Sequence, residues 1–366
     1  MAKVYYIDFH TKSGKNMLQK LKNLIEEAGI EKINFEKRHV AIKIHFGEPG
    51  NLAYIRPNYA RVIVDKIKSL GGKPFLTDCN TLYVGRRNEG LNHLETAYEN
   101  GFSPFSTNAH VIIGDGIKGT DDIEIPINLE YVKNAKIGRA IADSDIIISM
   151  NHFKGHESTG FGGALKNLGM GCGSRAGKME MHSSGKPRVN EVMCRFCKKC
   201  AEVCAHQAIT YLATNKAKIN QDLCVGCGRC IGACAFNAIK PIWNESEEIL
   251  VKKIAEYSLA VVKGKPNFHI NFIMDVSPNC DCASYNDVAI VPNIGILASF
   301  DPVALDKASV DMVNAAPAVE ESLLKQKKYH QDKFKMLHPD TKWEEGLIYG
   351  EKIGLGERKY ELIKVK

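Results

Sequence analysis

Short apolar runs alternate with longer amphipathic stretches along most of this chain. Apolar runs bounded by polar loops are typical of buried strands. Six such strands are predicted after the strand that opens the chain at residues 1–7: Val40–Phe46, Pro74–Thr77, Val111–Gly114, Ile146–Met150, Phe268–Met274 and Val288–Val291. Helices are predicted over Pro57–Leu70, Glu247–Val262 and Asp301–Asn314. Strands that alternate with helices predict an α/β fold with a mostly parallel sheet and helices on both faces.

One segment interrupts this alternation. Residues 187–242 hold few large apolar side chains and eight of the twelve cysteines. The predicted organisation is therefore an α/β body in two parts, 1–186 and 243–366, around a small α+β module at 187–242. The second part ends in a charged C-terminal segment whose structure the pattern does not define.

The cysteines of this segment form one spacing motif that occurs twice. Both runs read C-x-x-C-x-x-C-x-x-x-C, the ligand spacing of bacterial-type [4Fe–4S] sites, in which the fourth cysteine serves the other cluster. The expected sets are Cys194, Cys197, Cys200 and Cys234 for one cluster, and Cys224, Cys227, Cys230 and Cys204 for the other. Zinc ribbons do not need a third and fourth cysteine at this offset, and disulfides would suit a secreted chain. Ala205 and Ala235 replace the proline that usually follows the last cysteine, which removes no ligand.

The formal net charge of +7 is concentrated in the cysteine-rich part. This positive charge has two interpretations. It can form a basic docking face for an acidic redox partner, or it can compensate the negative charge of the clusters. Compensation explains most of the excess. No nucleic-acid motif accompanies the charge, and no apolar run approaches the roughly 20 residues of a membrane span. Labile clusters need a reducing compartment, and no signal peptide is present, so we expect a cytoplasmic protein of an anaerobe or microaerophile.

Candidate chemistry gathers where the strand Ile146–Met150 ends. The following loop carries His152, Lys154 and His156, and ligands bind beyond the carboxyl ends of parallel strands. A glycine-rich start of the next helix favours an anion. The predicted site has His152 and His156 moving protons, Lys166 holding negative charge, and a set of ligand-binding residues: His45, Lys154, Gly160, Gly162, Gly163 and Asn167. The competing interpretation is a glycine-rich turn with solvated charges.

Other polar residues are weaker candidates. Arg56, Arg86, Arg87 and His93 lie in polar segments, and Asp115 follows a strand; each alone is typical of a surface or turn residue. The pair Cys280 and Cys282 predicts either a third metal site or a redox-active pair. The alternative for this pair, and for Cys79 and Cys172, is ordinary buried thiols, which behave as small hydrophobes.

Four segments together resemble one known family. They are 151–171 (NHFKGHESTGFGGALKNLGMG), 78–83, 277–282 (SPNCDC) and 295–306 (GILASFDPVALD). The chain resembles the iron–sulfur-centre proteins of the domain-of-unknown-function 362 family with an inserted ferredoxin module. The resemblance implies an α/β body and two [4Fe–4S] clusters, without a settled reaction. More distantly, His156 with Gly160–Lys166 resembles the histidine-plus-GG-x-x-K element of nickel-pincer lactate racemases.

Three functions are therefore expected to compete. The first is a redox protein whose two clusters carry electrons to or from a small anionic substrate or cofactor in the α/β body. The second is a ferredoxin-type carrier without catalysis of its own. The third is a non-redox isomerase or racemase with structural clusters. A deep pocket at the Ile146–Met150 strand end, close to a cluster, favours the first.

Overall fold

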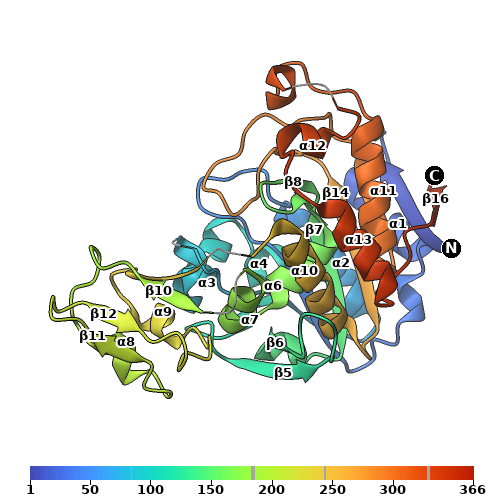
Figure 1. Cartoon of the computed structure of the whole chain (residues 1–366). Helices are drawn as coiled ribbons and strands as arrows, with labels where there is room; N and C mark the ends of the chain where they lie inside the picture. The colour runs from blue at the N-terminus through green and yellow to red at the C-terminus, as the bar shows by residue number, and fades with distance from the viewer. Residues whose placement is uncertain (84, 183–185, 243–244, 328–329) are drawn as a thin grey trace.

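The structure, a computed structural model, has a large α/β body from which a smaller lobe projects (Figure 1). It describes the whole chain except residues 84, 183–185, 243–244 and 328–329. The lobe is formed by the cysteine-rich insert, 187–242. Its predicted limits flank residues 183–185 and 243–244, which lie outside the described residues, so the exact boundaries stay a prediction.

An eight-stranded sheet forms the centre of the body. In spatial order its strands are β16 (Tyr360–Lys364), β1 (Ala2–Asp8), β15 (Gly295–Ser299), β14 (Asn267–Ile273), β7 (Ile146–His152), β2 (His39–Ile44), β3 (Lys73–Asp78) and β4 (His110–Ile113). Only β15 runs antiparallel to its neighbours. The carboxyl ends of β14, β7, β2, β3 and β4 therefore meet at one edge. The predicted mostly parallel α/β fold is confirmed.

Helices cover both faces of this sheet (Figure 1). One face packs against α1 (Met17–Glu27) and α2 (Pro57–Ser69), and α4 (Pro104–Thr107) packs on α2. The other face packs against α6 (Ala164–Cys172) and α11 (Pro302–Ala315), and α10 (Glu247–Val262) and α13 (Trp343–Lys352) form a further layer on these two helices. Alternate residues of one strand enter opposite cores: Ile146 and Ile148 face the first set, Ile147 the second. Burial on both faces explains why these strands read as unbroken apolar runs.

The remaining elements of the body are short or peripheral. They are η1 (Ile30–Lys32), η2 (Arg86–Asn88), α3 (Gly90–Glu99), β5 (Asp122–Pro126), β6 (Asn134–Gly138), α5 (Arg139–Ala142), β8 (Lys154–His156), β9 (Gly160–Gly162), α7 (Arg175–His182), η3 (Leu323–Gln326) and α12 (Lys333–Leu337). Strands β8 and β9 form a small hairpin directly after β7.

Two parts of the body differ from the sequence prediction. The predicted strand Val288–Val291 is wrong: this segment is irregular, and Ile290 donates its N–H to the Val276 carbonyl at 2.9 Å. Ile290 and Val291 are buried in the core without a neighbouring strand, whereas Val288 is exposed, which is why periodicity alone misread this run. The charged C-terminal segment, which the pattern left undefined, supplies β16, which pairs in parallel with β1.

The lobe consists of β10 (Pro187–Val189), α8 (Lys199–Glu202), β11 (Ile209–Tyr211), β12 (Ala217–Ile219), α9 (Arg229–Ala233) and β13 (Ile239–Pro241). Strands β10 and β13 pair antiparallel, so the two ends of the insert lie side by side. A small core of its own includes Ile209, Ile219 and Ile239. This core is too small to stabilise the lobe by burial alone.

A chain of buried polar contacts crosses the carboxyl edge of the sheet and fixes α6. Asp306 accepts the backbone N–H groups of Ala164 and Leu165 at 2.7 and 2.9 Å, so its carboxylate caps the start of α6. It also accepts from Asn271 at 2.9 Å. From there, side chains link strand to strand. The buried polar network consists of Asp306, Asn271, Asn151, Asn167, Lys43, Asp78, Arg87 and Glu48.

Replacing the capping carboxylate tests this network. Asp306→Ala leaves two helix N–H groups and the Asn271 amide without their buried acceptor, and we expect the free energy of unfolding to fall by at least about 2 kcal/mol. Denaturant unfolding followed by circular dichroism measures the change. The exposed Asp340→Ala is the control and should stay within about 0.5 kcal/mol of wild type. Equal stability of Asp306→Ala and Asp340→Ala would show that the cap is not structural.

Candidate functional site

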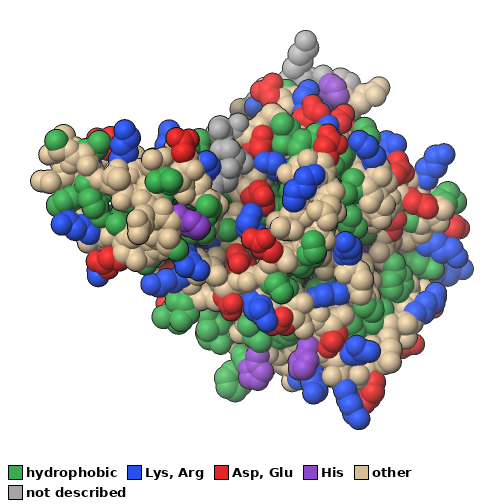
Figure 2. All heavy atoms as spheres, turned by 60° about the horizontal axis from the view of Figure 1, so that its bottom comes forward, with side chains coloured by type: hydrophobic (Ala, Val, Ile, Leu, Met, Phe, Trp, Pro, Cys, Tyr) green, Lys and Arg blue, Asp and Glu red, His purple; other side chains and the backbone are tan. Residues whose placement is uncertain are grey.

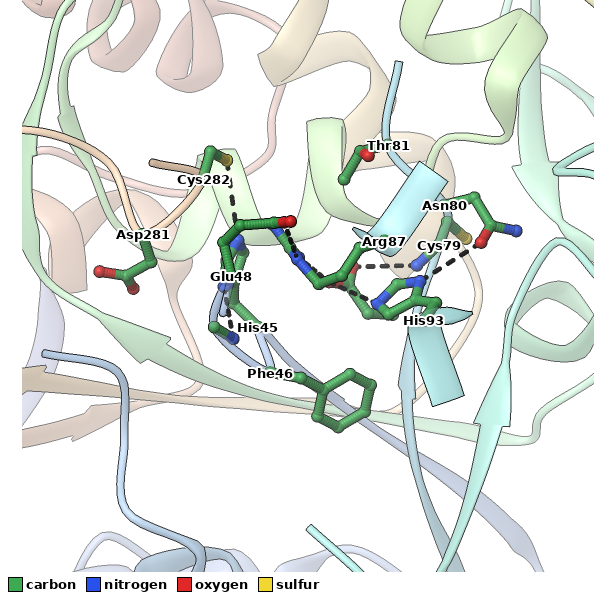
Figure 3. Close-up of polar contacts among 12 residues, drawn as sticks. His45, Phe46, Glu48, Cys79, Asn80, Thr81, Arg87, His93, Asp281 and Cys282 are labelled. Atoms are coloured by element: carbon green, nitrogen blue, oxygen red, sulfur yellow. Dashed lines mark hydrogen bonds and ion pairs between the residues drawn. The ribbon is translucent and has the colours of Figure 1, made fainter. Parts of the chain in front are cut away.

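A cavity of about 580 Å³ opens at the carboxyl edge of the parallel strands. Its lining brings together most of the predicted site: His45, His152, Lys154, His156, Gly162, Gly163, Lys166, Asn167 and Cys282. Figure 3 shows one wall, where Cys282 faces His45 and where Glu48 meets Arg87. Segments far apart in sequence therefore converge on one polar cavity.

His152 is held by two acceptors. Its Nδ1 lies 2.8 Å from an Asp281 carboxylate oxygen, and its Nε2 lies 2.8 Å from the Met274 carbonyl. Burial alone would raise the pKa of Asp281, but the charges of His152 and Lys154 hold that pKa below its usual range. With both ring nitrogens engaged, His152 positions the loop of Asp281. The structure gives no support for its predicted role in proton transfer.

His156 is a neutral donor to the cavity. Its Nδ1 accepts the backbone N–H groups of Ser158 and Thr159 at 3.0 and 3.2 Å, so the ring proton belongs on Nε2. Burial and the nearby Lys166 charge lower its pKa to about 3. The His156 ring is therefore neutral near neutral pH, and its Nε2–H can donate a hydrogen bond to a ligand oxygen. The protonated imidazolium form, which could act as a general acid, is not populated there.

The two cysteines of the SPNCDC segment lie beside charged and polar groups of the cavity. The sulfurs of Cys280 and Cys282 are 3.1 Å apart, and the Lys166 ammonium donates to Cys280 at 3.1 Å. Cys282 lies 3.7 Å from Nε2 of His45. The hydrogen bond from Cys282 lowers the pKa of Cys280 to about 5 against its burial, with help from Lys166. Burial and the Arg87 charge lower the pKa of His45 to about 4.

The glycine-rich segment does not provide the predicted anion site at a helix start. The first N–H groups of α6 are taken by Asp306, and a Cβ on Gly163 would come within 2.3 Å of that carboxylate. Gly163 is thus required by the cap. Gly160 has φ +73° and packs against Trp343, and it is not among the residues that line the cavity. Anion binding would depend instead on the side chains of the cavity.

The cavity cations already have partners within the protein. Lys154 lies 3.3 Å from Asp281, and Lys43 lies 2.9 Å from Asp78. Asn167 accepts from Lys43 at 2.6 Å, so it belongs to the buried polar network as well as to the lining. Each ammonium carries three donors, and a ligand can therefore share Lys166 with Cys280.

The weaker candidates separate clearly. Arg87 is buried, bonds Glu48 at 2.8 Å and Asp78 at 3.3 Å, and lines the cavity. His93 is buried beside Asp78 but does not line the cavity. Arg56 pairs with the half-buried Asp275, Arg86 pairs with the exposed Glu99, and Asp115 accepts a hydrogen bond from Asn80.

Sequence reasoning missed Lys43, Asp78, Tyr83, Asp281 and His182, all at or beside the cavity. Lys43 interrupts an apolar strand and Asp78 is the last residue of one, and a charged residue in or at the end of a buried strand was the signal available.

Cys79 and Cys172 fit the interpretation as buried thiols. Cys79 donates to the Cys172 carbonyl at 3.4 Å, and burial raises the pKa of Cys172 to about 11. Within the described residues, no three His, Cys, Asp or Glu side chains are grouped to hold a single metal ion. A four-iron cube is larger than an ion and spreads its thiolates further apart.

Two small cavities in the insert divide the eight remaining cysteines. One is lined by Cys194, Cys197, Cys200 and Cys234; the other is lined by Cys204, Cys224, Cys227 and Cys230. This division follows the crossed sets expected from the spacing, and not the order of the two runs. Backbone N–H groups of Ala208 and Ala238 donate to Cys204 and Cys234 at 3.3 Å each. Such donors stabilise thiolate sulfur, so the residues fit two cubes.

The second cysteine loop docks on the body. Gly228 has φ +70°, and a Cβ there would lie 3.1 Å from the Arg175 side chain of α7. Its counterpart in the first run is Lys198, with φ 64°. At this position the second run, which contacts the body, has a glycine, and the first run has a lysine.

A cleft of about 780 Å³ lies between insert and body. It is lined by Cys234 on the insert side. Leu82 and Tyr83 line both this cleft and the polar cavity. The Tyr83 hydroxyl interacts with Arg87 and with Cys282. The polar cavity and the cleft beside the insert thus share a wall that Leu82 and Tyr83 form.

Fold and site together define an α/β protein with a polar cavity at the carboxyl edge of its sheet and a cysteine-rich insert beside it. The chain belongs to the family described as domain of unknown function (DUF362), which matches residues 40–311. No curated protein matches the chain.

Two solved structures are similar to this chain. A Thermotoga maritima protein is 12% identical with a TM-score of 0.43, over 82% of this chain. The chain spans 58% of that protein's length. The lactate racemase apoprotein from Thermoanaerobacterium thermosaccharolyticum is 12% identical with a TM-score of 0.36, over 100% of this chain and 83% of its own. No helix in the described parts of this chain is long and apolar enough to cross a membrane.

The depressed pKa of Cys280 predicts a pH-dependent contribution to stability. Between about 5 and the usual 9.0, the folded protein holds fewer protons at this thiol than the unfolded chain. The contribution of the Cys280 thiolate to the free energy of unfolding is therefore fully present above pH 9 and is lost as the pH falls toward 5. The excess in melting temperature of wild type over Cys280→Ser should grow from pH 5 to pH 9.

Thermal unfolding of both proteins across this range measures the effect. Cys172→Ser is the control, because a thiol with a raised pKa gives no increase over the same range. A constant difference between wild type and Cys280→Ser would contradict the thiolate assignment.

Proposed function

We propose that the protein is an iron–sulfur redox protein. Two [4Fe–4S] clusters in the insert carry electrons to or from a small anionic substrate or cofactor in the cavity of the α/β body. The observation that supports this most is the shared lining of cavity and cleft by Leu82 and Tyr83, with Cys234 at the other side of the cleft. A plain carrier would not need a polar cavity of this size next to its cysteines.

The proposed ligand sets are those that line the two small insert cavities. When bound, the clusters supply one-electron chemistry at low potential. The chain's own residues do the rest. Lys166 offers positive charge, the Nε2–H of His156 orients an oxygen atom, and the buried walls exclude water.

An acidic redox protein is the proposed partner. Residues 188–240 carry eight Lys and Arg against three Asp and Glu, and Cys197 is exposed. Figure 2 shows basic and acidic side chains interspersed over the insert, so charge compensation within the lobe also accounts for part of this excess. Salt dependence of reduction by a partner would separate the two contributions.

The crossed ligand sets predict a specific pattern of cluster loss. Anaerobically prepared protein should contain about eight iron and eight sulfide per chain, and Cys204→Ser should lose about half of both. The lost cluster should be that of Cys224, Cys227 and Cys230, and not that of the run in which Cys204 stands. Metal analysis gives the content, and mass spectrometry of the cysteines that become open to alkylation in the folded variant shows which site remains.

Cys172→Ser is the matched control and should keep full iron. Loss of the Cys194 cluster alone in Cys204→Ser would refute the crossed assignment. Zinc in place of iron would refute the redox function altogether.

Ligand binding tests the cavity independently of the clusters. Lys166→Ala should weaken binding of a small carboxylate or phosphate ester by roughly 1–3 kcal/mol, the scale of a lost charge-assisted hydrogen bond. Thermal-shift screening first identifies the ligand, and titration of the variant follows. His156→Ala should act in the same direction, while the exposed Lys3→Ala leaves affinity unchanged. Wild-type affinity in both cavity variants would favour the bare carrier.

A further inference from the structure

We propose that Cys280 and Cys282 are a redox-active dithiol that cycles between a disulfide and a thiolate–thiol pair at the cavity wall. The inference deepens the proposed function and rests on it, because that function supplies the electrons. The dithiol would collect two electrons, delivered one at a time, and hold them as a pair next to the substrate site.

The backbone already holds the two sulfurs together. The Ala283 N–H donates to the Cys280 carbonyl at 3.0 Å, which closes a turn around the Cys280–Asp281–Cys282 segment. Asp281, between the cysteines, is fixed by His152 at 2.8 Å and Lys154 at 3.3 Å. The sulfurs are 3.1 Å apart, so a disulfide needs them to approach by only about 1 Å.

The surrounding charges favour one direction of cleavage. In reduction, two electrons and one proton break the S–S bond; Cys280 becomes a thiolate and Cys282 takes the proton as a thiol. Lys166, 3.1 Å from the Cys280 sulfur, stabilises the thiolate that forms. A low-pKa sulfur is also the better leaving group. The two [4Fe–4S] clusters are the reductant, one electron each.

The position of the pair connects it to the insert. Cys282 lines the cavity and interacts with Tyr83, the residue that the cavity shares with the cleft beside Cys234. Of the other body thiols, Cys79 also lines the cavity, but its hydrogen bond goes to the Cys172 carbonyl and not to a second thiol. Cys172 is buried, has a carbonyl as its contact and does not line the cavity.

Mild oxidation of the cluster-loaded full chain tests disulfide formation. The protein is incubated anaerobically with hydroxyethyl disulfide, denatured in iodoacetamide, and digested for mass spectrometry. The wild-type peptide that contains residues 277–282 should lose both thiol hydrogens and resist alkylation. Cys280→Ser should show no such peptide, while Cys172→Ser should behave as wild type. Full alkylation of Cys280 and Cys282 in oxidised wild type would overturn the inference, while leaving the iron analysis of the proposed function untouched.

The second arm tests the link to the clusters. The oxidised protein is photoreduced with a deazaflavin, and the free thiols of the same peptide are counted over time. Reopening should be fast in wild type and largely lost in Cys234→Ser, because this variant lacks a ligand of the cluster beside the cleft. Equal reopening in both proteins would show that the pair does not receive cluster electrons, and this result would overturn the proposed delivery to the cavity as well.

Discussion

The site depends on one continuous set of buried polar contacts across the carboxyl edge of the sheet. Asp306 caps α6, and the chain of contacts continues through asparagines of β14 and β7 to Lys43 and Asp78. Burial alone would raise the pKa of Asp78, but the surrounding positive charges, Lys43 foremost, keep it low. Because each member satisfies the next, removal of one leaves an uncompensated buried group. The network thereby fixes where α6 presents Lys166 to the cavity.

The insert follows a different physical rule. Burial of its small core does not offset the conformational entropy lost on folding, so ligation by the cysteines is expected to stabilise the insert, as in other small metal domains. The two cysteine loops nevertheless share one local geometry: Asn190 and Asn220 each accept N–H groups of the following turn. The body adds a docking surface on α7. The insert and the α/β body are therefore stabilised in different ways, and they meet at the cleft that Tyr83 lines.

Periodicity and spacing predicted much of this structure. The parallel strands, the helix Glu247–Val262 and the crossed cysteine sets could be read directly, because each depends on local pattern. The contact between Lys166 and Cys280 could not, since 114 residues separate them. Asp306 was read as part of a helix and family motif, yet it occupies the helix start that the glycines were expected to offer to an anion. Long-range partners decide such roles, and sequence pattern does not contain them.

The central claim is that two [4Fe–4S] clusters lie next to one another in the insert, held by crossed cysteines. Electron paramagnetic resonance of the anaerobically prepared, dithionite-reduced protein tests it most directly. The account predicts signals of two reduced [4Fe–4S] clusters that are broadened by mutual magnetic interaction, because each cysteine run supplies both sites. A single uncoupled cluster signal, or an iron-free protein with bound zinc, would contradict it.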